Sequence, residues 1–156
     1  MLLSRLLSPG TPAMDQWTMR RVPHDAAPLR VLVVDDNQNA ALAMAAYLSL
    51  ENIEPRAVFG GREAIDMARE WAPHVILMDI SMPRCNGVEA ALALRRDPCT
   101  GGIAIIAHTA LDEAEVHRQV AGDEFDGYAQ KGRPPDELLA LITALVGSVP
   151  VAAGAL

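Results

Sequence analysis

Five polar side chains stand at the ends of apolar runs in this sequence. Asp35 and Asp36 share one such position, whereas Asp79, Thr109 and Lys131 each come at the end of a separate run. Nearly continuous apolar runs are typical of strands that a parallel sheet buries on both faces. Because the carboxyl ends of parallel strands meet at one edge of the sheet, we expect these five side chains to lie together.

The residue types at this edge indicate phosphoryl chemistry. Three carboxylates repel one another strongly unless a cation compensates their charge. Mg²⁺ prefers carboxylate oxygens and keeps open positions, at which it can hold a phosphoryl oxygen. Lys131 adds a compact positive charge and Thr109 adds a hydroxyl donor. The set is suited to holding a phosphoryl group in line with a carboxylate nucleophile, with Mg²⁺ as the cofactor.

Lys131 is the only lysine among the 13 lysine and arginine residues of the chain. An ammonium is a compact point charge, whereas a guanidinium is a planar fork. A sole lysine at a strand end therefore suggests that a compact charge is required there. Taken singly, Asp35 and Asp36 could be solvated surface and Asp79 could cap a helix. The register of all five positions favours a site over these alternatives.

The elements that must position these side chains alternate along the chain. The apolar runs predict five strands, and segments of helical periodicity predict five helices between and after them. The strands are expected at 29–34, 54–59, 74–78, 103–107 and 127–130, and the helices at 37–50, 64–71, 88–94, 112–120 and 135–146. This alternation predicts an α/β fold, a five-stranded parallel doubly wound sheet with five helices. We expect the flavodoxin-like strand order 2-1-3-4-5.

The ends of the chain lack this regularity. Residues 1–28 contain Pro9, Gly10, Pro12 and Pro23 and show no sustained periodicity, so we expect a flexible N-terminal extension. The domain is expected over 29–147, followed by a tail at 148–156. Within the domain, Asn37 is a possible helix cap, and 86–87 is expected to be a turn that ends the loop after Asp79.

Composition argues against several classes of function. The net charge of -7 and the lack of a basic face predict no direct contact with nucleic acid. No apolar run approaches the roughly 20 residues that span a bilayer, so no membrane segment is expected. Cys85 and Cys99 form no metal or redox motif and are expected to be free thiols of a cytoplasmic protein. The histidines share no metal-binding spacing and are expected to be structural or exposed: His24, His74, His108 and His117.

Four fragments, in this order and at this spacing, resemble the signatures of bacterial response-regulator receiver domains. They are VLVVDD at 31–36, VILMDISMPRCNG at 75–87, AHTA at 107–110 and YAQK at 128–131. The resemblance covers about residues 29–147. It implies the CheY-like fold of a receiver in a two-component system.

The resemblance also implies roles for individual residues. Asp79 would be the phosphoacceptor, with Asp36 and Asp79 as direct Mg²⁺ ligands. Asp35 would reach the metal directly or through water, and the backbone carbonyl of Ser81 would be a further ligand. The groups that bind or respond to the phosphoryl group would be Thr109, the backbone of Ala110, Tyr128 and Lys131. Of these, the Thr109 hydroxyl and the Tyr128 ring would form the family's switch pair. Tyr128 could instead be simply a core aromatic.

Two features of the sequence qualify the resemblance. The family usually has a proline after the lysine, whereas this chain has Gly132, which leaves the shape of that loop open. Ser81 and Leu111 stand at positions that vary within the family and tune how long the phosphoryl group survives.

The leading hypothesis is a stand-alone receiver, phosphorylated by a sensor histidine kinase or a histidine phosphotransfer protein. A rival is a small Mg²⁺-dependent phosphatase, although such enzymes typically carry a second carboxylate where this chain has Ser81. A third reading is a degenerate receiver that acts only as a scaffold. Because no output domain fits after residue 147, the output is expected to be a surface change.

We expect an unknown downstream protein to bind the face formed by the fourth helix, fifth strand and fifth helix, at 112–120 and 128–146. The protein would be a monomer or a phosphorylation-dependent dimer.

Overall fold

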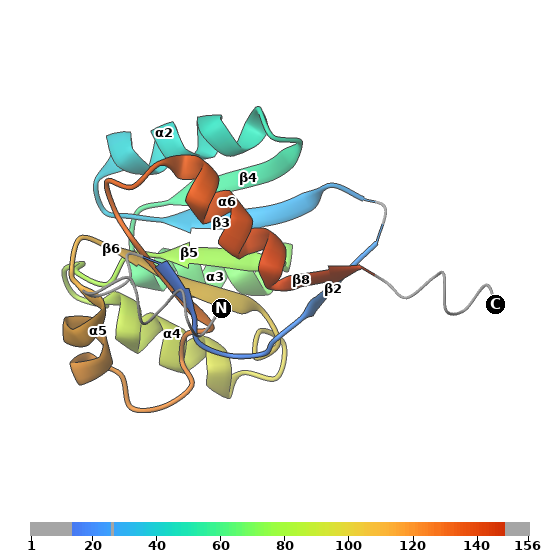
Figure 1. Cartoon of the computed structure of the whole chain (residues 1–156). Helices are drawn as coiled ribbons and strands as arrows, with labels where there is room; N and C mark the ends of the chain where they lie inside the picture. Colours follow the sequence, from blue (N-terminus) through green and yellow to red (C-terminus); the bar gives the residue numbers. More distant parts are fainter. Residues whose placement is uncertain (1–13, 26, 149–156) are drawn as a thin grey trace, which may run out of the picture.

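The computed structural model describes residues 14–25 and 27–148, and in these residues a central six-stranded sheet carries the fold (Figure 1). The strand order is β1-β7-β6-β5-β3-β4. All neighbours pair in parallel except β1, which runs antiparallel to β7. The strands are β1 (Met14–Gln16), β3 (Leu29–Val34), β4 (Ile53–Val58), β5 (Val75–Met78), β6 (Ala104–Thr109) and β7 (Gly127–Gln130).

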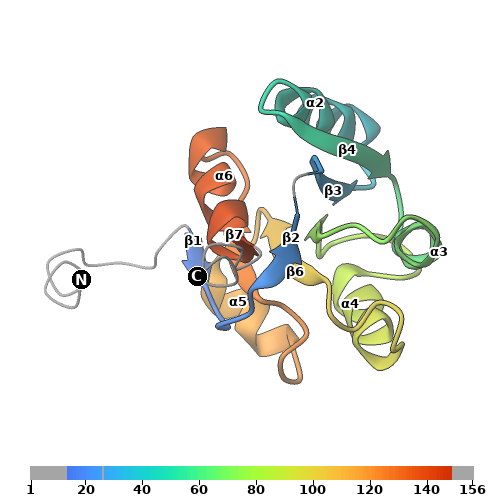
Figure 2. The same cartoon turned by 90° about the vertical axis from the view of Figure 1, so that its right-hand side faces the viewer.

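In the described part of the chain, helices α2 to α6 cover both faces of the sheet, as the end-on view in Figure 2 shows. They are α2 (Gln38–Ser49), α3 (Gly61–Trp71), α4 (Gly87–Arg96), α5 (Glu113–Gln119) and α6 (Pro135–Ala144). Alternate residues of β3 enter different cores: Leu32 and Val34 pack with α3, α4 and α5, whereas Val31 and Val33 pack with α2 and α6. This two-sided burial explains why the strand is apolar along its length.

The predicted fold class and strand order are confirmed. The five predicted strands correspond to β4-β3-β5-β6-β7 in space, which is the order 2-1-3-4-5. Asn37 does cap α2, because its side chain accepts a hydrogen bond from the backbone N–H of Ala40 at 3.1 Å. The structure adds one strand at the β7 edge that the sequence did not predict.

The prediction of a flexible N-terminal extension is wrong for residues 14–24. These residues form β1 and a further strand, β2 (Val22–His24), which pairs in parallel with β8 (Val146–Ser148). β8 also takes in Ser148, the first residue of the predicted tail. Strands of three residues are too short to show periodicity, and their partners lie more than 100 residues away in the sequence. Residues 1–13 and 149–156 lie outside the described part of the chain.

A buried carboxylate fixes the N-terminal segment to the domain. The side chain of Asp126 is fully buried and accepts hydrogen bonds from Thr18 Oγ1 at 2.7 Å and Arg20 Nε at 2.8 Å. It also accepts from Arg95 Nη2 on α4 and from the backbone N–H of Ile105 on β6. Asp126 therefore joins three segments that are distant in sequence.

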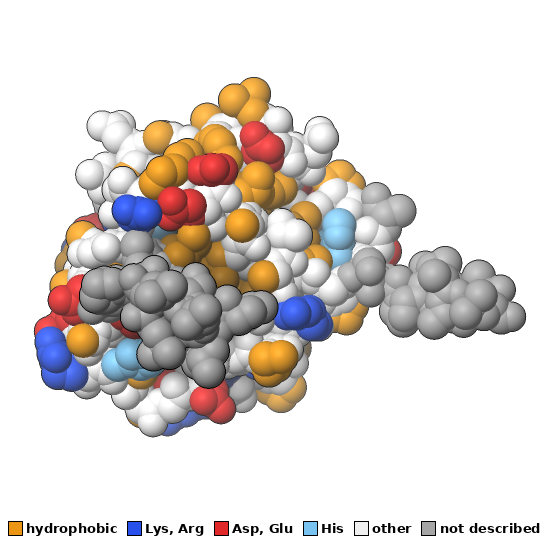
Figure 3. Space-filling model, viewed as in Figure 1, with side chains coloured by type: hydrophobic (Ala, Val, Ile, Leu, Met, Phe, Trp, Pro, Cys, Tyr) orange, Lys and Arg blue, Asp and Glu red, His pale blue; other side chains and the backbone are white. Residues whose placement is uncertain are grey.

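Figure 3, viewed from the same side as Figure 1, shows hydrophobic side chains over α2 and α6. Leu42 and Leu50, on and just after α2, are 54% and 82% exposed.

We expect Asp126→Asn to lower the free energy of unfolding by about 3 kcal/mol, because Arg95 would lose its charged partner in a buried setting. Urea denaturation at pH 7 measures this change. The matched control is Asp123→Asn, at an exposed position three residues earlier, which should stay within about 0.5 kcal/mol of the parent. Equal effects of the two substitutions would contradict the role given to Asp126.

Candidate functional site

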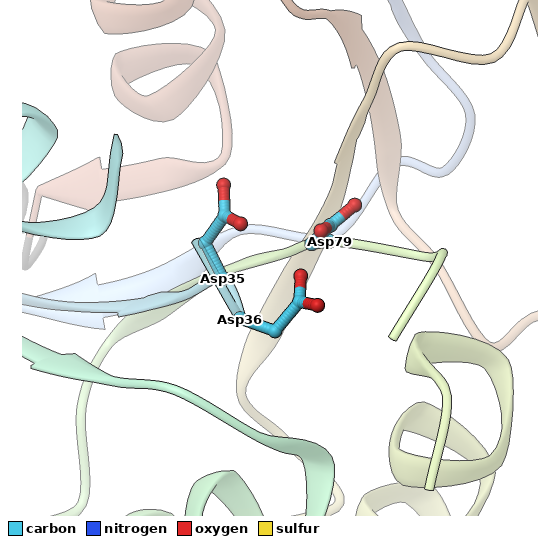
Figure 4. A group of neighbouring side chains, drawn as sticks. All are labelled: Asp35, Asp36 and Asp79. Carbon is cyan, nitrogen blue, oxygen red and sulfur yellow. The ribbon is translucent and has the colours of Figure 1, made fainter. Parts of the chain in front are cut away.

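The predicted edge of the sheet gathers the three aspartates (Figure 4). Asp35 and Asp36 follow β3, and Asp79 follows β5, the strand paired beside it. One carboxylate oxygen from each of the three lies within 4.8 Å of the others. Asp35 and Asp79 are each only 5% exposed, whereas Asp36 faces solvent. The cluster is therefore buried on one side and open on the other.

Lys131, directly after β7, reaches into the same cluster. Its Nζ lies 2.6 Å from Asp35 Oδ2 and 3.4 Å from Asp79 Oδ2. Burial alone would lower the pKa of Lys131, but its hydrogen bond to Asp35 and the charge of Asp79 raise that pKa above its ordinary value. The ammonium therefore stays charged, yet it is one positive group against three carboxylates.

The excess of negative charge in the cluster affects the pKa of Asp79. Burial raises the pKa of Asp79 to about 6; the neighbouring charge of Asp35 adds to the rise, and Lys131 opposes it. A backbone hydrogen bond from Ser81 also favours the ionised carboxylate. Without a further positive charge, Asp79 is thus harder to ionise than an ordinary aspartate.

The loop after Asp79 folds back tightly against the site. A Cβ on Gly87 would lie 2.1 Å from the backbone oxygen of Asp79, so only glycine fits where α4 begins. Asn86, predicted as part of a turn, is the N-cap of α4 and forms a capping box with Glu89. The cap fixes where α4 begins, and the backbone N–H of Gly87 donates to the backbone oxygen of Ile80 at 3.0 Å, which holds that start against the residue after Asp79.

The predicted switch pair is buried at the next strand ends. Thr109 and Tyr128 are each 1% exposed. The Tyr128 hydroxyl donates to the backbone oxygen of Leu111 at 2.7 Å, and the backbone N–H of Leu111 donates to Thr109 Oγ1 at 3.2 Å. Tyr128 is also part of the core that α3, α4 and α5 cover. The loop after β6 is therefore tied to both side chains.

Other predicted positions surround the cluster. Ser81 and Ala110 are exposed, and Leu111 is half-buried. Gly132, where the family usually has proline, has a φ of 88°, in the left-handed region that favours glycine. Pro134 and Pro135 then start α6.

Sequence reasoning gave no special role to His108 or Trp17. His108 lines a cavity of about 350 Å³ together with Asp35, Tyr47 and Lys131. Burial, with the nearby charge of Lys131, lowers the pKa of His108 to about 4, so the ring is neutral at pH 7. Trp17 stacks on Tyr128 and directly follows β1, a strand that no sequence pattern indicated.

Comparison with known proteins agrees with this geometry. The family described as the response regulator receiver domain matches residues 31–143. The response regulator MprA of Mycolicibacterium vanbaalenii is 34% identical over 122 residues, which cover 76% of this chain and 51% of that protein. The DNA-binding response regulator MtrA of Mycolicibacterium smegmatis is 33% identical over 118 residues, covering 74% of this chain and 49% of that protein.

Solved structures show the same fold. The Thermotoga maritima response regulator TrrA, crystallised in complex with Mg²⁺–BeF, has a TM-score of 0.69 and 27% identity, over 76% of this chain and 99% of that one. The Vibrio cholerae chemotaxis protein CheY4 has a TM-score of 0.68 and 24% identity, over 77% of this chain and all of that one.

The chain spans about half the length of the curated relatives it matches. Because MtrA is named as DNA-binding, these relatives do not support the expectation that the protein contacts no nucleic acid. Among the described residues, no helix has both the length and the apolar character needed to cross a bilayer. The matched family and the strand-edge cluster together show that the chain belongs to the response regulator receiver domains of two-component signalling systems.

Proposed function

We propose that this receiver accepts a phosphoryl group onto Asp79 from a sensor histidine kinase or a histidine phosphotransfer protein, in a Mg²⁺-dependent reaction. The observation that carries the proposal is the position of Asp79, a buried carboxylate within reach of two others and of Lys131. Family membership favours this signalling role over the phosphatase that the sequence left as an alternative.

The carboxylate cluster fits a hard divalent cation. Its three side chains offer oxygen ligands close enough to share one ion. The single positive charge of Lys131 offsets only part of their negative charge. The residues that would hold Mg²⁺ are Asp35, Asp36 and Asp79, with the backbone carbonyl of Ser81. When bound, the ion would neutralise charge on the phosphoryl oxygens and on Asp79.

The transfer itself uses groups of this chain. An Asp79 oxygen forms a bond to phosphorus while the bond from phosphorus to the donor's histidine nitrogen breaks, and its electron pair returns to the imidazole. Lys131 pairs with the negative charge of the transferred group. The hydroxyl of Thr109 and the backbone N–H of Ala110 donate hydrogen bonds to phosphoryl oxygens.

Phosphorylation would change the surface through Thr109. Movement of its hydroxyl toward the phosphoryl group withdraws the acceptor of the Leu111 N–H and so shifts the loop that the Tyr128 hydroxyl holds. The loop leads directly into α5, which begins at Glu113. We propose that a downstream protein reads this change on the face made by α5, β7 and α6, the predicted output face. The stand-alone receiver and the phosphorylation-dependent dimer stay predictions.

We expect incubation with acetyl phosphate and Mg²⁺ to add one phosphoryl group to the protein, seen by intact mass spectrometry. Asp79→Ala should add none, because the nucleophile is gone. Asp66→Asn, at an exposed position of α3, is the control and should label like the parent. Full labelling of Asp79→Ala would refute the assignment, and continuous release of phosphate by the parent would favour a phosphatase.

We expect Asp79→Asn to stabilise the metal-free protein at pH 7 by about 1–2 kcal/mol. The raised pKa means that the folded protein holds this proton more tightly than the unfolded chain. The stability from the proton is complete below the ordinary pKa of 3.8 and is lost as the pH rises through about 6.

Urea denaturation in EDTA at pH 7 and at about pH 4 measures this effect, and most of the gain should be lost at the lower pH. Asp66→Asn again serves as the control and should show no such dependence. An Asp79→Asn protein no more stable than its parent at pH 7 would show that the carboxylate is not under electrostatic strain.

We expect the pair Leu111→Glu and Ser81→Asn to shorten the lifetime of the phosphorylated protein. Hydrolysis needs a water in line with phosphorus, and polar side chains at these positions can orient it, whereas leucine excludes it. Each ~1.4 kcal/mol gained in the transition state is about tenfold in rate. The first-order decay of the two phosphorylated proteins, at one Mg²⁺ concentration without phosphodonor, provides the comparison. Decay of the parent at an equal or faster rate would remove these residues from control of the lifetime.

A further inference from the structure

The predicted output face is already occupied by the chain's own N-terminal residues. β1 pairs antiparallel with β7, so that Asp15 lies opposite Tyr128. After β1, the backbone N–H groups of Trp17 and Thr18 both donate to the backbone oxygen of Asp126, at 2.8 and 3.2 Å. β1 also lies against α6, as Figure 2 shows. Residues 14–18, called here the lid, therefore cover the edge of β7 between α5 and α6.

Trp17 connects the lid to two elements of that face, α5 and β7. Its ring stacks on His117 of α5, with centroids 4.1 Å apart and planes at 24°. It also stacks on the Tyr128 ring of β7, with centroids 6.1 Å apart and planes at 5°. Its indole Nε1 donates to Glu113 Oε2 at 2.6 Å. The contacts of the Trp17 side chain therefore require a particular distance between α5 and β7.

A short series of contacts connects Trp17 to the phosphorylation site. The Tyr128 ring touches Trp17 on one side, and its hydroxyl binds the backbone oxygen of Leu111. Leu111 in turn donates its N–H to Thr109 Oγ1. A shift of the loop after β6 moves the start of α5, where Glu113 lies, relative to β7. The stacking on Tyr128 and the hydrogen bond to Glu113 both depend on the present distance between α5 and β7, so a change in that distance would weaken at least one of them.

The lid can open without loss of the rest of the N-terminal segment. Arg20 Nε binds the buried carboxylate of Asp126 at 2.8 Å, and the backbone N–H of Val22 donates to Leu145 at 2.9 Å. β2 then pairs with β8 at the far end of the domain. The lid is held by the three-residue pairing of β1, whose residues are all half-buried, and by the contacts of Trp17 and Thr18. Because Arg20 and β2 have contacts of their own, they can stay in place while the lid opens locally.

We propose that residues 14–18 are an intramolecular lid on the α5–β7–α6 face, which phosphorylation of Asp79 releases so that a protein partner gains access. The inference rests on the proposed function and adds its regulation: the unphosphorylated protein blocks its own output surface. Because coupling is reciprocal, loosening the lid must favour the activated form to the same extent that activation loosens the lid.

Amide hydrogen exchange of the full chain tests the release, with Mg²⁺ and beryllofluoride as the probe for the phosphoryl group. The amides of Trp17 and Thr18 should exchange about fivefold faster or more in the loaded protein. The amide of Val22, beyond the tether, should keep its protection. Fluorine NMR reports the loading separately, and Asp79→Ala, which should not load, should show no change in the lid.

The outcomes distinguish the two proposals. Loading with unchanged protection of the Trp17 and Thr18 amides overturns the lid and leaves the proposed function intact. Failure to load overturns the proposed function and, with it, release by phosphorylation.

A pair of variants tests the reciprocal effect. Trp17→Ala removes the contacts with α5 and Tyr128, and it should raise the apparent affinity for beryllofluoride about fivefold or more. Met19→Ala is the control, because Met19 lies in the same segment but is 84% exposed, and its affinity should match the parent. Circular dichroism confirms that both variants are folded. Equal or weaker affinity in folded Trp17→Ala would overturn the lid as an inhibitory contact.

Discussion

Mutual repulsion among three carboxylates is the constraint around which this domain is arranged. The sheet brings their oxygens within 4.8 Å of one another and buries two of the side chains, while one lysine offsets part of the charge. The fold holds them there through parallel strands whose ends coincide and through a loop that leaves no room for a side chain at Gly87. The excess negative charge of these carboxylates favours binding of a cation, and the bound cation can in turn hold a transferred anionic group.

The contrast between two buried aspartates shows how such strain is recognised. Asp126 is fully buried, but donors from Thr18, Arg20 and Arg95 and a backbone N–H satisfy it. It therefore serves as a structural junction. Asp79 has Lys131 at 3.4 Å and two carboxylates for neighbours, and its pKa is raised to about 6. Burial is common to both residues, and it is the balance of partners that separates a structural from a reactive carboxylate.

The sequence was sufficient for the parallel core and for the positions of the clustered residues. Both follow from local signals: continuous apolar runs predict buried strands, and the rule that strand ends share an edge brings Asp35, Asp79 and Lys131 together. The N-terminal strands could not be predicted, because β1 consists of three residues and is held by partners such as Asp126 and Tyr128 that lie more than 100 residues away. The cap at Asn86 was read as a turn because its polar side chain suits both roles.

The two edges of the sheet also differ in how they resist self-association. β4 forms one edge, and it carries Pro55, which has no N–H to offer, between the charged Glu54 and Arg56. At the opposite edge, β1 lies along β7, whose first three residues are buried. Such a strand, if bare, is a template on which other chains aggregate. β1 therefore also protects the protein against aggregation, and we expect a truncation that removes β1 to lower its solubility.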